Sequence, residues 1–402
     1  MGKDNILVGL EIGTSKICVV VGEAKADGPI KILGVGMTPS RGVRKGEIVD
    51  FDTALSCVRD ALAEAEDKSD VTIKNVFVGV SGGHIRSFNN RGCVNLPEDR
   101  EEIEEIDCED VAISARDVSI PQQNAFLHTI LQHYYVDGQD GVLNPTGLLG
   151  RMLEADFHII HGIGNRIKNA VRCVKEIGLE VEDVVFNGLA SAQVVLSQQQ
   201  KDLGALVIDI GGGTTDYILY VEGAVKQSGV LAVGGDHITN DISMGLGIPM
   251  AKAERLKMEE GDATIGNAPP GDTILLKDEV GFVGRGIERE KLNTIIHLRV
   301  REAFEMLKRS IEEGPYLPMI GTGVVITGGC SHLRGIGGLA QEVFNMPVQI
   351  AHAQSTSGLT AASENPQLAS AIGILRYAQA CYANRPAKRG IIGKLKDLFG
   401  KR

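Results

Sequence analysis

Long hydrophobic runs are missing from this 402-residue chain. None of its apolar segments approaches the roughly 20 consecutive residues that a membrane-spanning helix needs. Residues 1–5 lead directly into a strand-like segment and not into the apolar core of a signal peptide. We therefore expect the protein to stay on the cytoplasmic side of the membrane. With 43% hydrophobic residues, the chain is large enough for two or more lobes with sizeable cores.

Paired metal-binding or disulfide-forming residues are missing as well. The seven cysteines are an odd number, widely scattered, and without a Cys-x-x-Cys pair, which argues against a disulfide framework and a zinc site. His128 and His133 are five residues apart and do not share a helix face, and His158 and His161 lie in an alternating segment. We interpret the cysteines as reduced core residues and the histidines as structural.

Two glycine-rich turns are the main chemical signal in the sequence. Residues 6–21 contain two strand-like segments around Gly13-Thr14-Ser15-Lys16, and Glu11 lies near the end of the first segment. Residues 205–221 repeat this pattern around Gly211-Gly212-Gly213-Thr214-Thr215-Asp216, with an aspartate near the end of the preceding strand. The repetition predicts two related halves.

The residue types in both turns suit a phosphate ligand. Glycine lets backbone N–H groups approach phosphate oxygens, and hydroxyl groups add further donors. Carboxylates at strand ends can hold a hydrated Mg²⁺ that offsets the phosphate charge. One glycine-rich hairpin would be an ordinary turn, but two at corresponding places favour a shared phosphate site.

A third glycine cluster, residues 327–331, follows another strand-like segment and precedes a helix predicted from about residue 335 to 344. This pattern suits the wall behind a nucleoside. Residues 251–259 have a helical pattern, and Glu254 and Lys257 lie three residues apart on one face, within reach of ribose hydroxyls and the base. The alternative for this pair is an ordinary solvated side-chain contact, which is the more frequent case.

Together these motifs resemble the actin and heat-shock chaperone ATPase superfamily, and within it the FtsA family of bacterial cell-division proteins. The resemblance covers essentially the whole chain. Its specific stretches are residues 10–14, 42–50, 80–85, 136–141, 144–145, 188–191, 209–216 and the terminal amphipathic segment. It implies an α/β, actin-like two-lobed fold with ribonuclease H-like halves, an FtsA-type inserted subdomain and a C-terminal amphipathic helix.

The resemblance also implies that ATP and Mg²⁺ bind between the lobes. The phosphates would contact Gly13, Thr14, Ser15 and Lys16 from one lobe and Gly212, Gly213, Thr214 and Thr215 from the other. The metal would face Glu11, Asp209 and Asp216, and the nucleoside would contact Gly234, Gly235, Glu254, Lys257, Gly328 and Gly329. Asp209, Asp216 and Thr214 are the candidate catalytic residues because they would orient water. A ligand held from both lobes stabilises their closure and can thereby bias polymer contacts.

One carboxylate of the chaperone ATPases is missing. Where those proteins have Asn-Glu-Pro-Thr, this chain has Asn187-Gly188-Leu189-Ala190. We therefore expect ATP binding with weak hydrolysis at most, slower than roughly 1 s⁻¹, the low end of ordinary enzymes. The alternatives are a metabolic kinase, for which no second pocket with its own acid/base residue is evident, and a PilM-type pilus-assembly adaptor, which the stretch around Asp137 and the terminal segment disfavour.

By resemblance the chain divides into two lobes with two additions. The first lobe comprises residues 1–80 and 165–200, with an insert at 81–164, and the second comprises 201–244 and 314–383, with a small subdomain at 245–313. A helix predicted at 367–383 would return to the first lobe, before a linker at 384–389 and an amphipathic helix at 390–402. FtsA-like proteins use the insert for head-to-tail polymerisation and for later division partners.

The small subdomain carries a basic cluster. Arg285, Arg289, Lys291 and Arg299 precede or line a long helix predicted at residues 289–312. In FtsA-like proteins the corresponding subdomain binds the acidic, apolar carboxy-terminal peptide of the tubulin-like protein FtsZ, so these residues are candidate contacts. The alternative, with about even odds, is that they form ordinary surface pairs with neighbouring glutamates.

The last residues of the chain have the pattern of a membrane-binding helix. The candidate lipid contacts are Ile391, Ile392, Leu395, Leu398 and Phe399 on one narrow face, with Lys394 and Lys396 outside it. Seven basic residues and one acidic residue give residues 385–402 a net charge of +6, so the rest of a chain of net charge −11 carries −17. An anionic leaflet would attract this tail, whereas the acidic body would be repelled by a leaflet or by nucleic acid.

A helix packed on its own domain, or a frayed end, is the alternative for the tail. One short helix would bind lipid weakly, so stable attachment needs several copies side by side. These observations and the resemblance together predict an ATP-dependent, polymer-forming adaptor at the cytoplasmic face of the bacterial inner membrane. It would anchor the FtsZ ring at the division site and help to recruit other divisome proteins.

Overall fold

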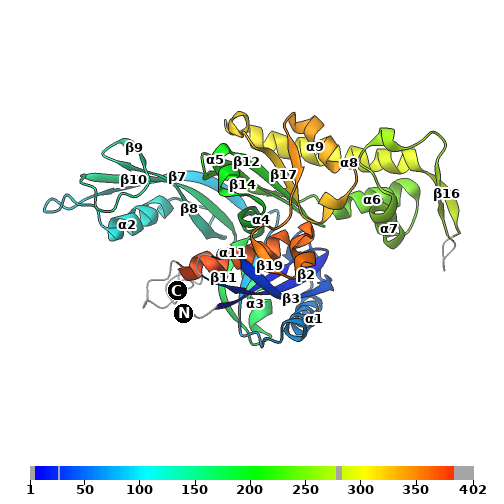
Figure 1. Ribbon diagram of the computed structural model, residues 1–402, viewed down its shortest axis with the longest axis horizontal. Helices are drawn as coiled ribbons and strands as arrows, with labels where there is room; N and C mark the ends of the chain where they lie inside the picture. The colour runs from blue at the N-terminus through cyan, green and yellow to red at the C-terminus, as the bar shows by residue number, and fades with distance from the viewer. Residues whose placement is uncertain (1–4, 26–27, 278–282, 384–402) are drawn as a thin grey trace.

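The computed structural model describes residues 5–25, 28–277 and 283–383 (Figure 1). The predicted linker and amphipathic helix, with the candidate lipid contacts Ile391, Ile392, Lys394, Leu395, Lys396, Leu398 and Phe399, lie outside the described residues. Among the described residues, no helix combines the length and the apolar character needed to cross a bilayer.

Each half of the chain contains a core sheet with the same strand order. The first sheet runs β11-β6-β1-β2-β3, and its strands are β11 (Glu180–Phe186), β6 (Asn75–Val80), β1 (Asn5–Ile12), β2 (Lys16–Ala24) and β3 (Ile30–Pro39). The second runs β18-β17-β12-β13-β14, and its strands are β18 (Val348–Ile350), β17 (Gly323–Thr327), β12 (Ala205–Ile210), β13 (Thr215–Val221) and β14 (Ala224–Leu231). In both sheets two parallel pairings are followed by two antiparallel pairings. The prediction of two related halves is therefore confirmed.

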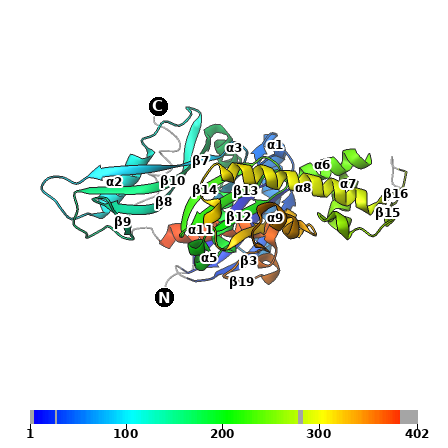
Figure 2. The same cartoon turned by 90° about the horizontal axis from the view of Figure 1, so that it is seen from above.

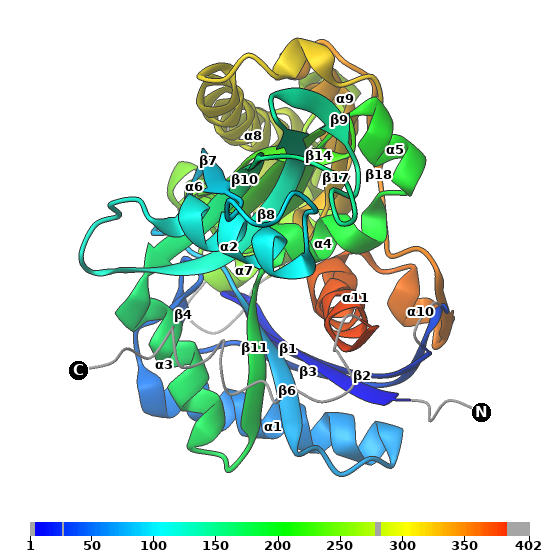
Figure 3. The same ribbon diagram turned by 90° about the vertical axis from the view of Figure 1, so that its left-hand side faces the viewer.

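Helices cover both faces of the first sheet. Figure 3 shows α1 (Phe51–Ser69) and α3 (Gly164–Lys175) on one face and α11 (Ala369–Ala383) on the other. Helix α1 begins after Asp50, whose carboxylate accepts a hydrogen bond from the Thr53 N–H at 3.2 Å. Its buried residues recur every three or four positions, which is the helical period. A short strand, β19 (Thr356–Gly358), extends the same sheet beside β3.

Helices α11 and α4 (Asn187–Val195) join the two lobes. Helix α11 packs on β1, β2 and β6 of the first sheet, as its expected return to the first lobe requires, and it crosses α4. Helix α4 in turn contacts β12 and β13 of the second sheet. At the crossing, a side chain on Gly373 would overlap the backbone of Ala190, so only glycine allows this close approach.

The insert forms a separate layer at one end of the molecule. Its sheet has the order β7-β10-β8-β9, with β7 (Arg86–Asn95), β10 (Met152–Ile163), β8 (Asn124–Val136) and β9 (Gln139–Val142), and α2 (Glu105–Arg116) packs on it. A small core of its own includes Ile103, Val111, Leu153 and Phe157. The acidic segment at residues 98–110 includes the start of α2, where Ile103, before the helix, is buried and Ile106, in its first turn, is 51% exposed.

The small subdomain lies at the opposite end of the long axis (Figures 1 and 2). It contains α7 (Met250–Glu260), β15 (Thr273–Leu276), β16 (Arg285–Glu288) and the first part of α8 (Arg289–Glu312). Helix α6 (Gly235–Leu246) begins before residue 245 but packs on α7 and α8, so it is counted with this subdomain. Figure 2 shows α8 running along the long axis from this subdomain toward the centre of the molecule, where α9 (Ile336–Phe344) packs against it. The long helix has the bounds predicted from its sequence.

Three buried histidines link the stability of the fold to pH. Burial lowers the pKa of His84 and of His128 to about 4 and that of His158 to about 3, with nearby positive charges adding to the effect at His84 and His158. Each ring is therefore neutral in the folded protein and protonated in the unfolded chain below its ordinary pKa of about 6.5. The stability that depends on neutral rings is fully present above the unfolded pKa of about 6.5. It decreases as the pH falls below that pKa, and it is lost once the pH has fallen through the folded-state pKa.

We expect that between pH 6.5 and pH 4 unfolding takes up about three protons at these rings, which lowers the free energy of unfolding, while the raised pKa values of the buried Asp209 and Asp216 oppose part of this fall. Denaturant titrations at several pH values measure this slope. His128→Gln should reduce the slope by about one proton, because the ring is removed while an acceptor is kept for the Phe186 N–H, which lies 3.0 Å from Nε2. An unchanged slope in that variant would contradict the assignment.

Candidate functional site

The two glycine-rich hairpins face each other between the lobes. In the first, between β1 and β2, the Gly13 N–H donates to the Lys16 carbonyl at 3.0 Å. In the second, between β12 and β13, the Gly211 N–H donates to the Thr214 carbonyl at 2.9 Å. The same four-residue turn is therefore closed by the same bond in both halves, which explains why the two sequence motifs are alike.

A cavity of about 440 Å³, its open mouth included, lies between these hairpins. It is lined by Glu11, Ile12, Gly13, Thr14, Ser15, Lys16, Gly46, Ser81, Asn187, Asp209, Gly211, Gly212, Gly213, Thr214 and Asp216. A Cβ atom on Gly212 would lie 2.8 Å from the Ser15 Cβ, and one on Gly213 would lie 2.5 Å from the Thr14 Oγ1. The hairpins therefore approach so closely that only glycine fits at these two positions.

The site holds more negative than positive groups. The Lys16 ammonium donates to the Glu11 carboxylate at 3.2 Å. Burial and, to a smaller extent, the charge of Glu11 raise the pKa of Asp209 to about 7, although Lys16 opposes the shift. Burial and the nearby Asp209 raise the pKa of Asp216 well above its ordinary value. Because one lysine faces three carboxylates, the site is suited to an additional cation.

The lysine itself stays charged. Burial acts to lower the pKa of Lys16, but the negative groups around it, chiefly the charge of Glu11 and the hydrogen bond to it, together outweigh burial, and the net shift is upward. A cation on the first hairpin therefore faces the glycine N–H groups of the second hairpin across the cavity. This combination of a fixed positive charge and backbone donors is suited to phosphate oxygens.

The carboxylates fit a hydrated metal ion better than a directly coordinated one. Across the described part of the chain, no three His, Cys, Asp or Glu side chains lie close enough together to hold a metal ion. Glu11, Asp209 and Asp216 nevertheless share the cavity wall, and Mg²⁺ commonly keeps several waters that bridge it to carboxylates. The donor set is thus consistent with Mg²⁺ held through water.

Three cavity residues were missed as site residues in the sequence analysis. The Ser81 hydroxyl donates to the Asp216 carboxylate and lies 3.3 Å from the Thr214 Oγ1. The Gly46 N–H donates to the Thr14 hydroxyl at 2.9 Å. Asn187 is 5% exposed, and its Oδ1 has no hydrogen-bond partner among the residues that the structure describes. The position of Ser81 directly after β6 was an available signal, because the carboxyl ends of parallel strands form the ligand edge of such sheets.

The candidate nucleoside residues lie beside the cavity and do not line it. Lys257 Nζ donates to the Gly235 carbonyl at 3.1 Å and to the Glu254 carboxylate at 2.7 Å, and it also contacts Thr239. The lysine side chain is only 11% exposed, so this pair is not the solvated contact considered as the alternative. It stabilises the loop that contains Gly234 and Gly235.

The remaining glycines and Thr215 lie behind the second hairpin. A Cβ atom on Gly328 would overlap the Asp209 carboxylate, and Gly328 has φ +86°, a conformation that favours glycine. Gly329 lies near the Gln367 side chain. The Thr215 hydroxyl donates to the Val233 carbonyl at 2.8 Å, so this side chain points away from the cavity.

The basic cluster of the small subdomain is largely paired with groups of the same subdomain. Arg285 donates to the Leu246 and Gly247 carbonyls at the end of α6, and Arg289 forms ion pairs with Glu260 and Asp272. Arg299 and Lys291, the other two basic residues, differ in their contacts. Arg299 pairs with Asp241 and Glu302, while Lys291 is exposed. The surface-pair alternative therefore describes the contact of Arg299 with Glu302, whereas both partners of Arg289 are distant in the sequence.

Comparisons with known proteins agree with this architecture. Residues 206–373 match the family described as cell division protein FtsA, and residues 82–161 match the SHS2 domain inserted in FTSA. The chain is 38% identical to cell division protein FtsA of Pseudomonas aeruginosa, covering 92% of this chain and 89% of that protein. It is 34% identical to FtsA of Escherichia coli K12, covering 95% and 92%, respectively.

Solved structures show the same fold at low sequence identity. A PilM–PilN type IV pilus biogenesis complex matches with a TM-score of 0.64 and 16% identity, covering 93% of this chain and 98% of that chain. MreB5 of Spiroplasma citri bound to ADP matches with a TM-score of 0.55 and 14% identity, covering 95% and 99%, respectively. These likenesses establish the actin-like fold alone, whereas the sequence relatives above span nearly the whole chain. The chain therefore belongs to the FtsA family of cell division proteins.

Proposed function

We propose that this protein binds ATP, forms polymers at the cytoplasmic face of the membrane, and anchors the FtsZ ring during cell division. The observation that carries the proposal is the cavity between the paired hairpins, which combines glycine N–H groups, Lys16 and an excess of carboxylates in a member of the FtsA family. The MreB5 structures of the same fold, bound to ADP and to AMPPNP, support a nucleotide as the ligand.

The proposed nucleotide site uses both lobes. Lys16 and the N–H groups of Gly212 and Gly213 would bind phosphate oxygens, and Mg²⁺, when bound, would neutralise further phosphate charge. Asp209, with a pKa of about 7, can accept a proton from a water molecule, and Asp216 and Thr214 would orient that water. Because Gly188 replaces the glutamate of the chaperone ATPases, we propose that hydrolysis is slow.

The proposed polymer is head to tail. The insert and the small subdomain lie at opposite ends of the long axis (Figure 1), and both carry exposed apolar side chains. On the insert Leu143 is 95% exposed and Leu149 is 71% exposed, and on the small subdomain Met244 is 75% exposed and Leu275 is 79% exposed. Exposed apolar groups at two unlike ends favour contacts between successive copies.

The proposed partners attach at the small subdomain and the tail. An acidic peptide of FtsZ would contact the candidate residues Arg285, Arg289, Lys291 and Arg299, of which Lys291 and Arg285 are the most exposed. The basic amphipathic segment at residues 390–402 would bind the membrane in many copies at once through the polymer.

Liposome co-sedimentation tests this proposal. With ATP and anionic vesicles, we expect the full-length protein to carry FtsZ into the pellet, whereas a chain that ends before Gly390 should leave both proteins in the supernatant. A Leu395→Glu/Phe399→Glu variant should behave like the truncated chain, because two charges on the apolar face oppose insertion. Asp397→Asn, outside that face, is the matched control and should pellet like the wild type. Equal sedimentation of full-length and truncated protein would refute membrane anchoring by the tail.

A further inference from the structure

The insert is attached to the two lobes in different ways. Its chain leaves the first lobe at Ser81 and returns to it at Gly164, but its sheet lies against β14 of the second lobe. Strand β14 is the outer strand of its sheet, so one of its edges has no neighbouring strand of that sheet. A side-on contact at such an edge can pair backbone groups that would otherwise face water.

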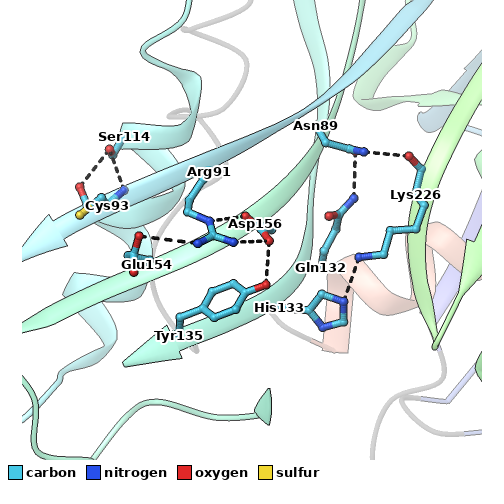
Figure 4. A network of polar contacts seen from close by, with 10 residues as sticks. All are labelled: Asn89, Arg91, Cys93, Ser114, Gln132, His133, Tyr135, Glu154, Asp156 and Lys226. Carbon is cyan, nitrogen blue, oxygen red and sulfur yellow. Dashed lines mark hydrogen bonds and ion pairs between the residues drawn. The ribbon is translucent and has the colours of Figure 1, made fainter. Parts of the chain in front are cut away.

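Side chains of the insert bind the backbone of β14. The Asn89 amide donates to the Lys226 carbonyl at 2.9 Å (Figure 4). The Gln132 amide donates to the Val225 carbonyl at 2.6 Å. The Ser87 hydroxyl donates to the Ser228 backbone carbonyl at 2.7 Å. Three residues from two insert strands therefore bind the backbone carbonyls of residues 225, 226 and 228 in β14.

Two histidines of the insert bind side chains of the same strand. His133 Nε2 lies 2.9 Å from Lys226 Nζ, so the neutral ring accepts a bond from the ammonium group (Figure 4). Burial, with the charge of Lys226, lowers the pKa of His133, which keeps the ring neutral. His158 is 1% exposed and lies 2.7 Å from both the Ser228 hydroxyl and the Asn89 amide oxygen. We call these residues of the insert and of β14 the β14 latch.

Strand β14 is connected to the second hairpin, which lines the cavity. The segment that follows it binds the second hairpin, because the Gly235 N–H donates to the Gly211 carbonyl at 2.9 Å and the Asp236 N–H donates to the Gly212 carbonyl at 2.8 Å. A shift of the second hairpin is therefore transmitted to β14 through backbone hydrogen bonds and not through flexible side chains.

The other connection of the insert also reaches the cavity. Ser81 donates to the Asp216 carboxylate of the second hairpin. The next residue, Gly82, has φ +143°, which favours glycine and makes this point a natural hinge. The insert is thus bonded to the second hairpin at its hinge through Ser81, and to the strand behind that hairpin through the β14 latch.

We propose that the β14 latch couples ligand binding between the lobes to the seating of the insert. The inference rests on ATP binding in the cavity, as proposed above. A ligand that draws the hairpins to a new separation shifts β14 relative to the first lobe, to which the insert is tethered, and so changes the latch. The latch consists of a small number of polar bonds, each of which contributes little to stability, so it can open without unfolding either lobe. By linkage, the factor by which ATP binding changes the equilibrium between the closed and the open latch is also the factor by which opening the latch changes ATP affinity.

The test compares latch variants with a matched control from the same region. Lys226→Met/Asn89→Ala/Gln132→Ala removes most of the latch. Arg91→Ala is the control, because Arg91 bonds Asp156 inside the insert at 2.6 Å and does not reach β14 (Figure 4). Calorimetry measures the ATP Kd of each protein, and hydrogen exchange with and without ATP measures protection of β7, β8 and β14. Lys226→Met alone provides a milder second variant if the triple variant fails to fold.

We expect the latch variants to change the ATP Kd at least about fivefold, the lower range of known couplings. They should also lose the effect of ATP on exchange in β7 and β8. Arg91→Ala should keep the wild-type values, and His133→Gln, which retains an acceptor for Lys226, should stay close to them. ATP binding with equal Kd and equal exchange in all variants would overturn the coupling alone. A wild-type protein that binds no ATP would overturn the proposed function and the coupling with it.

Discussion

Gly213→Val is expected to weaken ATP binding at least about 100-fold, which corresponds to about 3 kcal/mol. At this position even a Cβ atom would lie 2.5 Å from the Thr14 Oγ1 and 2.8 Å from the Thr14 Cγ2. The branched side chain of valine would occupy the space between the hairpins and prevent the backbone N–H from approaching a phosphate oxygen. Calorimetric titration with ATP and Mg²⁺ measures the loss.

The matched control is Gly266→Ala. No atom lies within 4 Å of a Cβ built at Gly266, so this substitution should leave ATP affinity unchanged. Far-UV circular dichroism should show that both variants are folded. The valine side chain at position 213 would contact a side chain of the opposite lobe. Because the lobes can separate to relieve this contact, neither lobe needs to unfold. Wild-type affinity in Gly213→Val would mean that the ligand does not bind between the hairpins.

Gly373→Val is expected to destabilise the protein by about 3 kcal/mol, at the upper end of overpacking effects. The position lies where α11 crosses α4, and an added Cβ atom would overlap the Ala190 carbonyl group. The backbone of α4 cannot yield locally, because α4 also packs on β12 and β13 of the second lobe. Separating the two helices would therefore disturb the join between the lobes. Urea denaturation followed by circular dichroism measures the shift.

Gly338→Ala in α9 provides the comparison for this variant. A Cβ atom there meets nothing within 4 Å, and alanine favours a helix interior over glycine by about 0.5–1 kcal/mol, so this variant should be slightly more stable than the wild type. If Gly373→Val unfolds at the wild-type urea concentration, the α11–α4 contact does not depend on a glycine.

Much of the fold followed from local patterns in the sequence. Strand β12 and helix α8 have the bounds that their hydrophobic patterns predicted, since both segments are bounded by glycine or by charged residues. The acidic segment before residue 105 was less predictable, because Ile103 is buried by the insert's own sheet and not by a helical repeat. Local pattern identifies regular elements, but it does not show which irregular segments a neighbouring sheet covers.

The site was predictable where its residues belong to one motif. Both hairpins were found because their glycines, hydroxyls and carboxylates are adjacent in the chain. Ser81 and Asn187 were missed because each is the residue after a strand of the first lobe, and its role depends on where the second hairpin lies. For the same reason the sequence could not show that Arg289 and Arg299 are paired, since three of their partners, Glu260, Asp272 and Asp241, lie outside α8.

The shared strand order of the two core sheets has a consequence for how the molecule arose. Two halves with one topology are what duplication of a single ancestral unit would produce, and such a pair would begin nearly symmetric. The later additions entered at non-equivalent points, after β6 in the first half and after β14 in the second. With these additions the two halves are no longer related by an internal two-fold axis, and the two ends of the molecule differ. A filament of copies stacked along the long axis of the molecule would therefore be polar, with two different ends.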